Sequence, residues 1–237
     1  MNIKGVMMFG AAAGMATLLF AESGAACRMS DKEKKEGFTH IFDGTSSTGW
    51  RSRAKPTFPE QGWEIRDGAL ITIPKNRGGD IITEKKYSNF IFKMDFQLTS
   101  KANSGLKYLY DPQLHGGTTM EYQILDPAHS DAKAGIGGNR KIASLYDVLA
   151  APEAEKLLKP TGEWNEAMLV VKGMHVEHWL NGRKVLEFER GSDEFNAAVA
   201  KSKFNKHPGW GAQTRGHLLL QYHNDKVSYR NLRIKEL

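Results

Sequence analysis

Short segments in which apolar and polar side chains alternate follow one another along residues 38–237, and this alternation limits the fold more than any other feature of the sequence. In residues 90–98 every second residue is Phe, Met or Leu, while Lys, Asp and Gln occupy three of the four positions between them. A period of two is typical of a β-strand with one buried face. Gly, Asn, Asp and Pro separate these segments, which indicates an all-β domain.

One turn signal stands out among the separators. Asn181 and Gly182 lie between the strand-like segments 175–180 and 183–190, and both residue types tolerate the positive φ angles of a type I′ turn. This dipeptide therefore predicts a β-hairpin. Two further strands are expected within residues 216–234.

Helical signals are few. They are confined to residues 152–158 and to 193–201, where Ser192 is a suitable N-cap. Many strands and one or two short helices in a domain of this length predict a two-sheet jelly-roll sandwich, an architecture whose concave sheet commonly carries the ligand site.

The N-terminal 26 residues have the pattern of an export signal. Lys4 precedes an apolar run at residues 6–20, and a cluster of small residues follows. At about 1.5 Å per residue this run is too short to cross a hydrocarbon core of roughly 30 Å. We therefore expect an exported protein, located in the periplasm or cell envelope.

Cys27 directly follows the small residues of this signal. It is either the acylated cysteine of a lipoprotein or an ordinary thiol left after cleavage, and we favour the lipoprotein because no other cysteine occurs in the chain. A lipid on Cys27 would be the protein's one contact with a membrane. The mixed-charge residues 27–36 are expected to form a solvated tether, followed by a single domain at 37–237.

Composition excludes several other functions. The net charge of +6 comes from Lys and Arg residues scattered among acids, so no nucleic-acid partner is expected. A single cysteine excludes an internal disulfide and a cysteine-clustered zinc site. The chain contains no phosphate-binding loop motif and no Gly-x-Ser-x-Gly nucleophile motif.

Polar side chains recur on one face of strands that are otherwise apolar. Glu121 and Gln123 share a face in residues 120–126, as do Gln221 and His223 in 218–223. In a purely structural sheet these side chains would lie on a solvated outer face. Because two strands show the pattern, we favour a polar cleft.

Other polar residues occur near predicted strand ends and loops. Asn103 opens a predicted strand that also carries Lys107, and Arg230 lies on the last strand. Tyr146 ends a long Gly-rich segment that begins at residue 128. Long loops in compact domains are either mobile or functional, and polarity alone does not separate these alternatives.

The order of the motifs along residues 38–237 resembles the 3-keto-disaccharide hydrolase domain family. Each motif alone is weak, but this many in one order is specific. The motifs are Phe38-Thr39-His40-Ile41-Phe42-Asp43-Gly44, Gly49-Trp50, Trp63-Glu64-Ile65, Asp67-Gly68-Ala69-Leu70, Asn103-Ser104-Gly105-Leu106-Lys107-Tyr108, Glu121-Tyr122-Gln123-Ile124-Leu125-Asp126, Ser144-Leu145-Tyr146-Asp147, Gly162-Glu163-Trp164-Asn165, Asn181-Gly182, Leu220-Gln221-Tyr222-His223 and Tyr229-Arg230-Asn231-Leu232.

The resemblance implies a concanavalin A-like jelly roll that acts on glycosides oxidised at C3 of the sugar. It also implies a set of cleft residues: Glu121, Gln123, Asp126, Gln221, His223 and Arg230. Many members of the family carry Asp-His-Gly near the last hairpin, where this chain has Tyr222-His223-Asn224.

A 3-keto-glycoside can be cleaved by elimination, because the ketone acidifies the C2 proton. This chemistry needs a base near C2, an acid near the glycosidic oxygen and cations or donors at the enolate oxygen. We expect Glu121 and His223 to supply the base and the acid, in either order, and Lys107 and Arg230 to stabilise the enolate. Substrate binding is expected from Asn103, Gln123, Asp126, Tyr146 and Gln221.

Alternatives remain for several of these residues and for the function. Arg230 could instead form a structural ion pair with Glu121 or Asp126. A divalent metal could be bound by Glu121, Asp126 or His223, but no spacing requires one, so we predict no metal site and no cofactor. The predicted function is a hydrolase or lyase/hydratase acting on 3-keto-glycosides, and the alternative is a non-catalytic carbohydrate-binding sandwich module.

Overall fold

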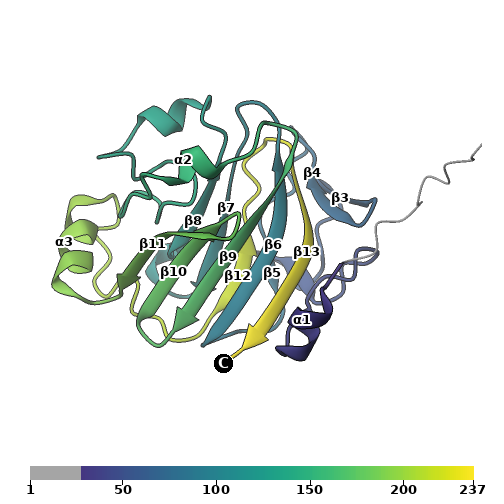
Figure 1. Cartoon of the computed structure of the whole chain (residues 1–237), viewed down its shortest axis with the longest axis horizontal. Helices are drawn as coiled ribbons and strands as arrows, with labels where there is room; N and C mark the ends of the chain where they lie inside the picture. Colours follow the sequence, from purple (N-terminus) through teal and green to yellow (C-terminus); the bar gives the residue numbers. More distant parts are fainter. Residues whose placement is uncertain (1–27) are drawn as a thin grey trace, which may run out of the picture.

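Two antiparallel β-sheets pack face to face in the computed structural model, which describes residues 28–237 (Figure 1). The predicted all-β, two-sheet sandwich is therefore confirmed. The predictions for residues 1–27, including the export signal and the lipid on Cys27, lie outside the described residues. None of the helices in residues 28–237 has the length and hydrophobicity that a membrane span requires.

The larger sheet has eight strands, and seven of them lie in the order β11-β10-β9-β6-β13-β4-β3, with β1 paired to β13. Figure 1 shows this sheet in front of the second layer. Its strands are β1 (Thr39–His40), β3 (Trp63–Arg66), β4 (Ala69–Thr72), β6 (Phe90–Leu98), β9 (Trp164–Lys172), β10 (His175–Leu180), β11 (Arg183–Glu189) and β13 (Val227–Glu236).

The smaller sheet has five strands in the order β2-β5-β12-β7-β8. Its central strand, β12, ends at Leu220, so the predicted extension of this strand to residue 223 is wrong. The strands are β2 (Trp50–Ser52), β5 (Ile81–Thr83), β7 (Asn103–Tyr110), β8 (Glu121–Leu125) and β12 (His217–Leu220).

The main hydrophobic core lies between the two sheets. Phe92 and Phe96 contribute to it from β6, and Leu106 and Tyr108 contribute from β7, all fully buried. Along β6 the burial alternates residue by residue, as the sequence predicts. Lys107, which lies between Leu106 and Tyr108 on β7, therefore faces outward, away from the larger sheet.

The predicted hairpin and helices are present. Asn181 and Gly182 have φ angles of 48° and 79°, which a type I′ turn between β10 and β11 requires. The helix α3 (Asp193–Lys201) begins after Ser192, whose hydroxyl oxygen accepts a hydrogen bond from the backbone N–H of Phe195. The helix α2 (Ala154–Leu157) and the 3₁₀ turns η1 (His115–Gly117) and η2 (Ser130–Lys133) lie in connections.

The predicted tether at 27–36 is wrong for the residues that the structure describes. Residues 31–35 form the helix α1 (Asp31–Lys35), with a capping box between Ser30 and Glu33. The Glu33 carboxylate accepts hydrogen bonds from Arg233 Nε at 2.9 Å and Lys93 Nζ at 3.0 Å. Because these partners lie on β13 and β6, the charges that suggested solvation instead attach α1 to the outer face of the larger sheet.

Candidate active site

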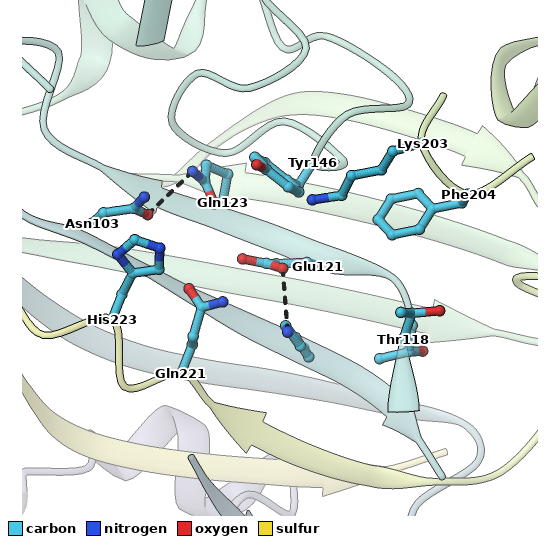
Figure 2. Close-up of a pocket in the computed structure, with 11 residues that line it drawn as sticks. Asn103, Thr118, Glu121, Gln123, Tyr146, Lys203, Phe204, Gln221 and His223 are labelled. Carbon is cyan, nitrogen blue, oxygen red and sulfur yellow. Dashed lines mark hydrogen bonds and ion pairs between the residues drawn. The ribbon is translucent and has the colours of Figure 1, made fainter. Parts of the chain in front are cut away.

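A hollow of about 180 Å³ lies on the outer face of the five-stranded sheet, and we call it the active-site pocket (Figure 2). Every predicted site residue except Asp126 and Arg230 lines it. The lining residues are Asn103, Lys107, Thr118, Thr119, Glu121, Gln123, Tyr146, Lys203, Phe204, Gln221 and His223.

Two neighbouring strands place the charged groups at the floor of the pocket. Lys107 on β7 is directly opposite Glu121 on β8 in the strand register, and Lys107 Nζ lies 3.8 Å from Glu121 Oε2. The carboxylate bends over Gly105, where a Cβ atom would lie 2.1 Å from Glu121 Oε1. Gly105 is thus the residue that leaves room for the carboxylate, a close approach that explains a glycine inside a strand.

Burial dominates the electrostatics of Glu121. Its side chain is only 7% exposed. Desolvation raises the pKa of this carboxyl above its usual value, and the positive charges of Lys107 and Lys203 oppose the shift without cancelling it. A carboxyl whose pKa is raised toward neutrality can accept and return a proton near physiological pH.

Amide side chains border this carboxylate. Gln123 Nε2 lies 3.4 Å from Asn103 Oδ1, as the dashed line in Figure 2 marks. Turning the Gln123 amide by half a turn lets its nitrogen donate to Glu121 Oε1 and to the Ser104 carbonyl, both at 3.2 Å. Asn103 and Gln123 therefore offer donors and acceptors of the kind that bind sugar hydroxyls.

Gln221 and His223 reach the pocket from the chain that leaves β12. Hydrogen bonds from Gln221 N to the Gly105 carbonyl and from Ser104 Oγ to the Gln221 carbonyl hold this segment beside β7. His223 lies at the rim, with 49% of its side chain exposed, and its Nδ1 is 4.0 Å from Asp225 Oδ2. An acid thus lies close to His223 even though Tyr222, and not an aspartate, precedes it in the chain.

The Gly-rich segment contributes Tyr146, which forms one wall. Its hydroxyl donates to Asp131 Oδ2 at 3.1 Å, and Arg140 binds both Asp131 and Asp147. Burial raises the pKa of the Tyr146 hydroxyl, and Asp131 adds to the shift. This part of the long segment is therefore held in place by charged hydrogen bonds.

Lys203 and Phe204 were not predicted from the sequence. The backbone N–H of Lys203 donates to Asp147 Oδ2 at 2.8 Å, and its Nζ lies 4.1 Å from the centre of the Tyr146 ring. Burial lowers the pKa of Lys203, while the charge of Glu121 opposes this. The segment after α3 has no strand or helix periodicity, so no sequence signal marks Lys203 as a pocket residue.

Asp126 does not line the pocket. Its carboxylate accepts hydrogen bonds from Ala128 N and Thr161 Oγ1, both at 2.9 Å, which makes it a buried anchor between two loops.

Arg230 lies away from the pocket, so the expected contact with a bound enolate is wrong. It is on β13 in the larger sheet, where its Nε pairs with Asp95 Oδ2 at 3.3 Å and its guanidinium covers the Trp164 ring at 4.0 Å. The alternative ion pair with Glu121 or Asp126 is also wrong, because β13 pairs with β6 and β4 rather than with β8.

No cluster of potential metal ligands is found in the pocket among residues 28–237. The one group of three that these residues contain is His175, Glu177 and Glu187 in the larger sheet, where Lys184 already pairs with both glutamates. Glu121, Asp126 and His223 do not converge on one point.

Comparison with known proteins gives consistent matches. Residues 37–235 match the family described as 3-keto-alpha-glucoside-1,2-lyase-like domain. A 3-keto-disaccharide hydrolase from Bacteroides thetaiotaomicron is 32% identical over 233 residues, covering 85% of this chain and 79% of that protein.

Two solved structures from Parabacteroides distasonis, each of a candidate glycosyl hydrolase, share the fold. One has a TM-score of 0.77 and 33% identity and covers 90% of this chain and 99% of its own. The other has a TM-score of 0.66 at 23% identity and covers 84% of this chain and 99% of its own. The family expected from the sequence is thus confirmed: the chain belongs to the 3-keto-alpha-glucoside-1,2-lyase-like domain family.

Proposed function

We propose that this protein cleaves 3-keto-glycosides by elimination across C1 and C2, followed by addition of water. Family membership and the Bacteroides relative support hydrolase-type activity on carbohydrates. The observation that carries the finer proposal is a buried carboxylate, Glu121, with a raised pKa and two lysines nearby, in a pocket lined with amides.

The chemistry needs few groups. A base removes the C2 proton of the keto sugar, and the electron pair moves into an enolate at C2, C3 and the C3 oxygen. The C1–O bond then breaks, its electrons leave with the glycosidic oxygen, and that oxygen takes up a proton. Water adds across the resulting C1=C2 bond, so that the net reaction is hydrolysis.

The positions of the side chains suggest how these roles are divided. Glu121 is the base, because it lies at the floor beside the cations that would stabilise the enolate. Lys107 and Lys203 stabilise the enolate, the role that the sequence analysis assigned to Lys107 and Arg230. His223 at the rim is the acid for the leaving oxygen, since its imidazole lines the pocket and its Nδ1 lies 4.0 Å from Asp225 Oδ2, a carboxylate that can stabilise the protonated ring.

The number of acids in the pocket also favours elimination. Ordinary glycosidases use two carboxyl groups on either side of the scissile bond. Glu121 is the single carboxylate among the side chains lining this pocket. A reaction through an enolate requires one base and positive charge, which this pocket supplies.

The Glu121→Gln variant tests the proposal, with Glu177→Gln on the larger sheet as a matched control. With a 3-keto-glucoside, we expect product formation to fall by about 10²–10⁴-fold in Glu121→Gln and to stay unchanged in the control. In deuterated water, the wild-type enzyme should exchange the C2 proton, and the unoxidised glucoside should not react.

Undiminished turnover in Glu121→Gln would remove Glu121 from the mechanism. Binding of the keto sugar by the wild-type protein without any product would instead favour the non-catalytic carbohydrate-binding module.

A further inference from the structure

The active-site pocket is small for a disaccharide. Its volume of about 180 Å³ lies below the roughly 300–1,000 Å³ of typical sites for small molecules. If a glycoside is bound with its keto ring over Glu121, the leaving sugar must extend beyond this pocket. The surface next to the pocket should then carry groups that bind a second ring.

A second hollow of about 360 Å³ lies at the other edge of the same sheet. It is formed by the segment 52–61, which begins at the last residue of β2, and by the segment 77–80, which precedes β5. We call it the second hollow.

Asp80 links the two hollows. It lines the second hollow, and its Oδ1 accepts a hydrogen bond from Tyr222 N at 2.9 Å. The two neighbours of Tyr222 in the chain, Gln221 and His223, line the active-site pocket. Asp80 of the second hollow is therefore hydrogen-bonded to a residue, Tyr222, that is flanked in the chain by two residues of the active-site pocket.

Arg53 makes a second link. Its Nη1 lies 3.8 Å from Asp80 Oδ2, and a Cβ atom on Gly117 would lie 3.8 Å from the same nitrogen. Gly117 immediately precedes Thr118, which lines the active-site pocket. Arg53 and Asp80 thus lie along the border between the hollows.

An apolar cluster on the outer face of the sheet lies beside this border, because a Cβ atom on Gly117 would lie 3.3 Å from the hydroxyl oxygen of its member Tyr110. Ile82, Tyr110 and Leu219, from β5, β7 and β12, form a small buried cluster separate from the main core. Tyr110 reaches this face because β7 is irregular at Leu109, which has a φ angle of 50° and lies in the main core.

The chemistry of the second hollow suits a sugar. Arg53, Gln61, Arg77 and Asp80 offer several donors and acceptors for hydroxyl groups, and Phe58 offers a half-buried ring that can cover the apolar face of a pyranose. The guanidinium of Arg77 is exposed and has no hydrogen bond or ion pair with the described residues, so it is available to a ligand.

We infer that the second hollow is a binding site for the leaving sugar of the 3-keto-glycoside, a proposal that rests on the proposed function. Arg77 and Phe58 would bind this sugar directly. The Arg53–Asp80 pair would lie at the junction of the two rings.

Two substrates that share the keto ring test the inference: a 3-keto-disaccharide and a methyl 3-keto-glucoside, which has no second sugar. In Arg77→Gln and Phe58→Ala, we expect kcat/KM to fall about tenfold for the disaccharide and by less than about twofold for the methyl glycoside. Arg66→Gln, at an exposed arginine of β3, is the control and should change neither value.

An equal loss on both substrates, or no loss on either, would overturn the inference. Arg77→Gln keeps the test valid if Phe58→Ala impairs folding, because Phe58 packs against the core and Arg77 is exposed.

Calorimetry separates failure of the inference from failure of the proposed function. In a Glu121→Gln background, adding Arg77→Gln should weaken binding of the 3-keto-disaccharide several-fold and leave the methyl glycoside unaffected. If the wild-type protein turns over neither substrate, the proposed function fails, and the difference in binding still decides whether the second hollow holds a sugar.

Discussion

Glu33 and Glu121 are both buried carboxylates beside two cations, yet their surroundings shift their pKa values in opposite directions. Burial raises the pKa of Glu33, but hydrogen bonds from Arg233, Ser30 and Lys93 outweigh it and lower the pKa to about 2. At Glu121 burial prevails, because its nearest cation, Lys107, lies 3.8 Å away.

The difference lies in how completely each charge is bonded. Direct hydrogen bonds from Arg233 and Lys93 saturate Glu33 and hold α1 on the larger sheet. Glu121 keeps bonding capacity that a substrate could use. A saturated buried acid is a structural device, whereas an unsaturated one in a pocket is a candidate for proton transfer.

The largest expected effect is on the stability provided by Glu33. Glu33→Ala leaves Arg233, whose side chain is 6% exposed, without one of its carboxylates, and should lower the free energy of unfolding by about 3 kcal/mol. Urea denaturation measures this loss. Activity per folded molecule should not change, and a fall in kcat would contradict the purely structural role.

The contribution of Glu33 to stability should also depend on pH, in a direction set by its lowered pKa. Because the pKa of Glu33 is lowered, its contribution is present above about pH 4.5 and is lost as the pH falls toward about 2. Wild-type protein should therefore lose about 3 kcal/mol more than Glu33→Gln across this range. Parallel stability curves for the two proteins would show that Glu33 is not the group responsible.

A smaller effect is expected from filling the space under Glu121. In Gly105→Ala the new Cβ would lie 2.1 Å from Glu121 Oε1, so the carboxylate must move. Displacing a catalytic group by about 1 Å typically costs about 10²-fold in rate. We expect that loss in kcat with a 3-keto-glucoside, and an unchanged kcat would mean that the position of Glu121 is not critical.

The smallest of these effects concerns Lys203. Removing its charge in Lys203→Met should raise the pKa of Glu121 further, because that charge lowers it in the wild-type protein. Since the base acts when ionised, activity rises with pH through this pKa, and the acidic limb of the kcat/KM profile should move to higher pH.

Lys203→Arg keeps the charge and serves as the matched control. In Lys203→Arg the acidic limb of the kcat/KM profile should lie at the same pH as in the wild-type protein. A profile that falls uniformly in Lys203→Met without moving along the pH axis would indicate a structural role only.

Much of the fold and the floor of the site could be predicted, because both depend on local periodicity. The period of two places Glu121 and Gln123 on one face whatever the strand order. The type I′ turn at Asn181 and the cap at Ser192 are likewise local, and the structure contains both.

The errors come from contacts between distant parts of the chain. The sheet to which β13 belongs decides the fate of Arg230, and no residue near it encodes that choice. The docking of α1 depends on Arg233, far along the chain. Lys203 enters the pocket through a backbone bond to Asp147, which side-chain patterns do not reveal.

The attachment of α1 also places the start of the described chain on the side of the domain opposite the active-site pocket. The backbone N–H of Arg28 donates to Asn231 on β13, so the described chain begins on the larger sheet, whereas the active-site pocket opens on the outer face of the other sheet. A lipid on Cys27, which the sequence predicts, would therefore hold the domain from the side of the larger sheet and leave the active-site pocket open on the opposite side.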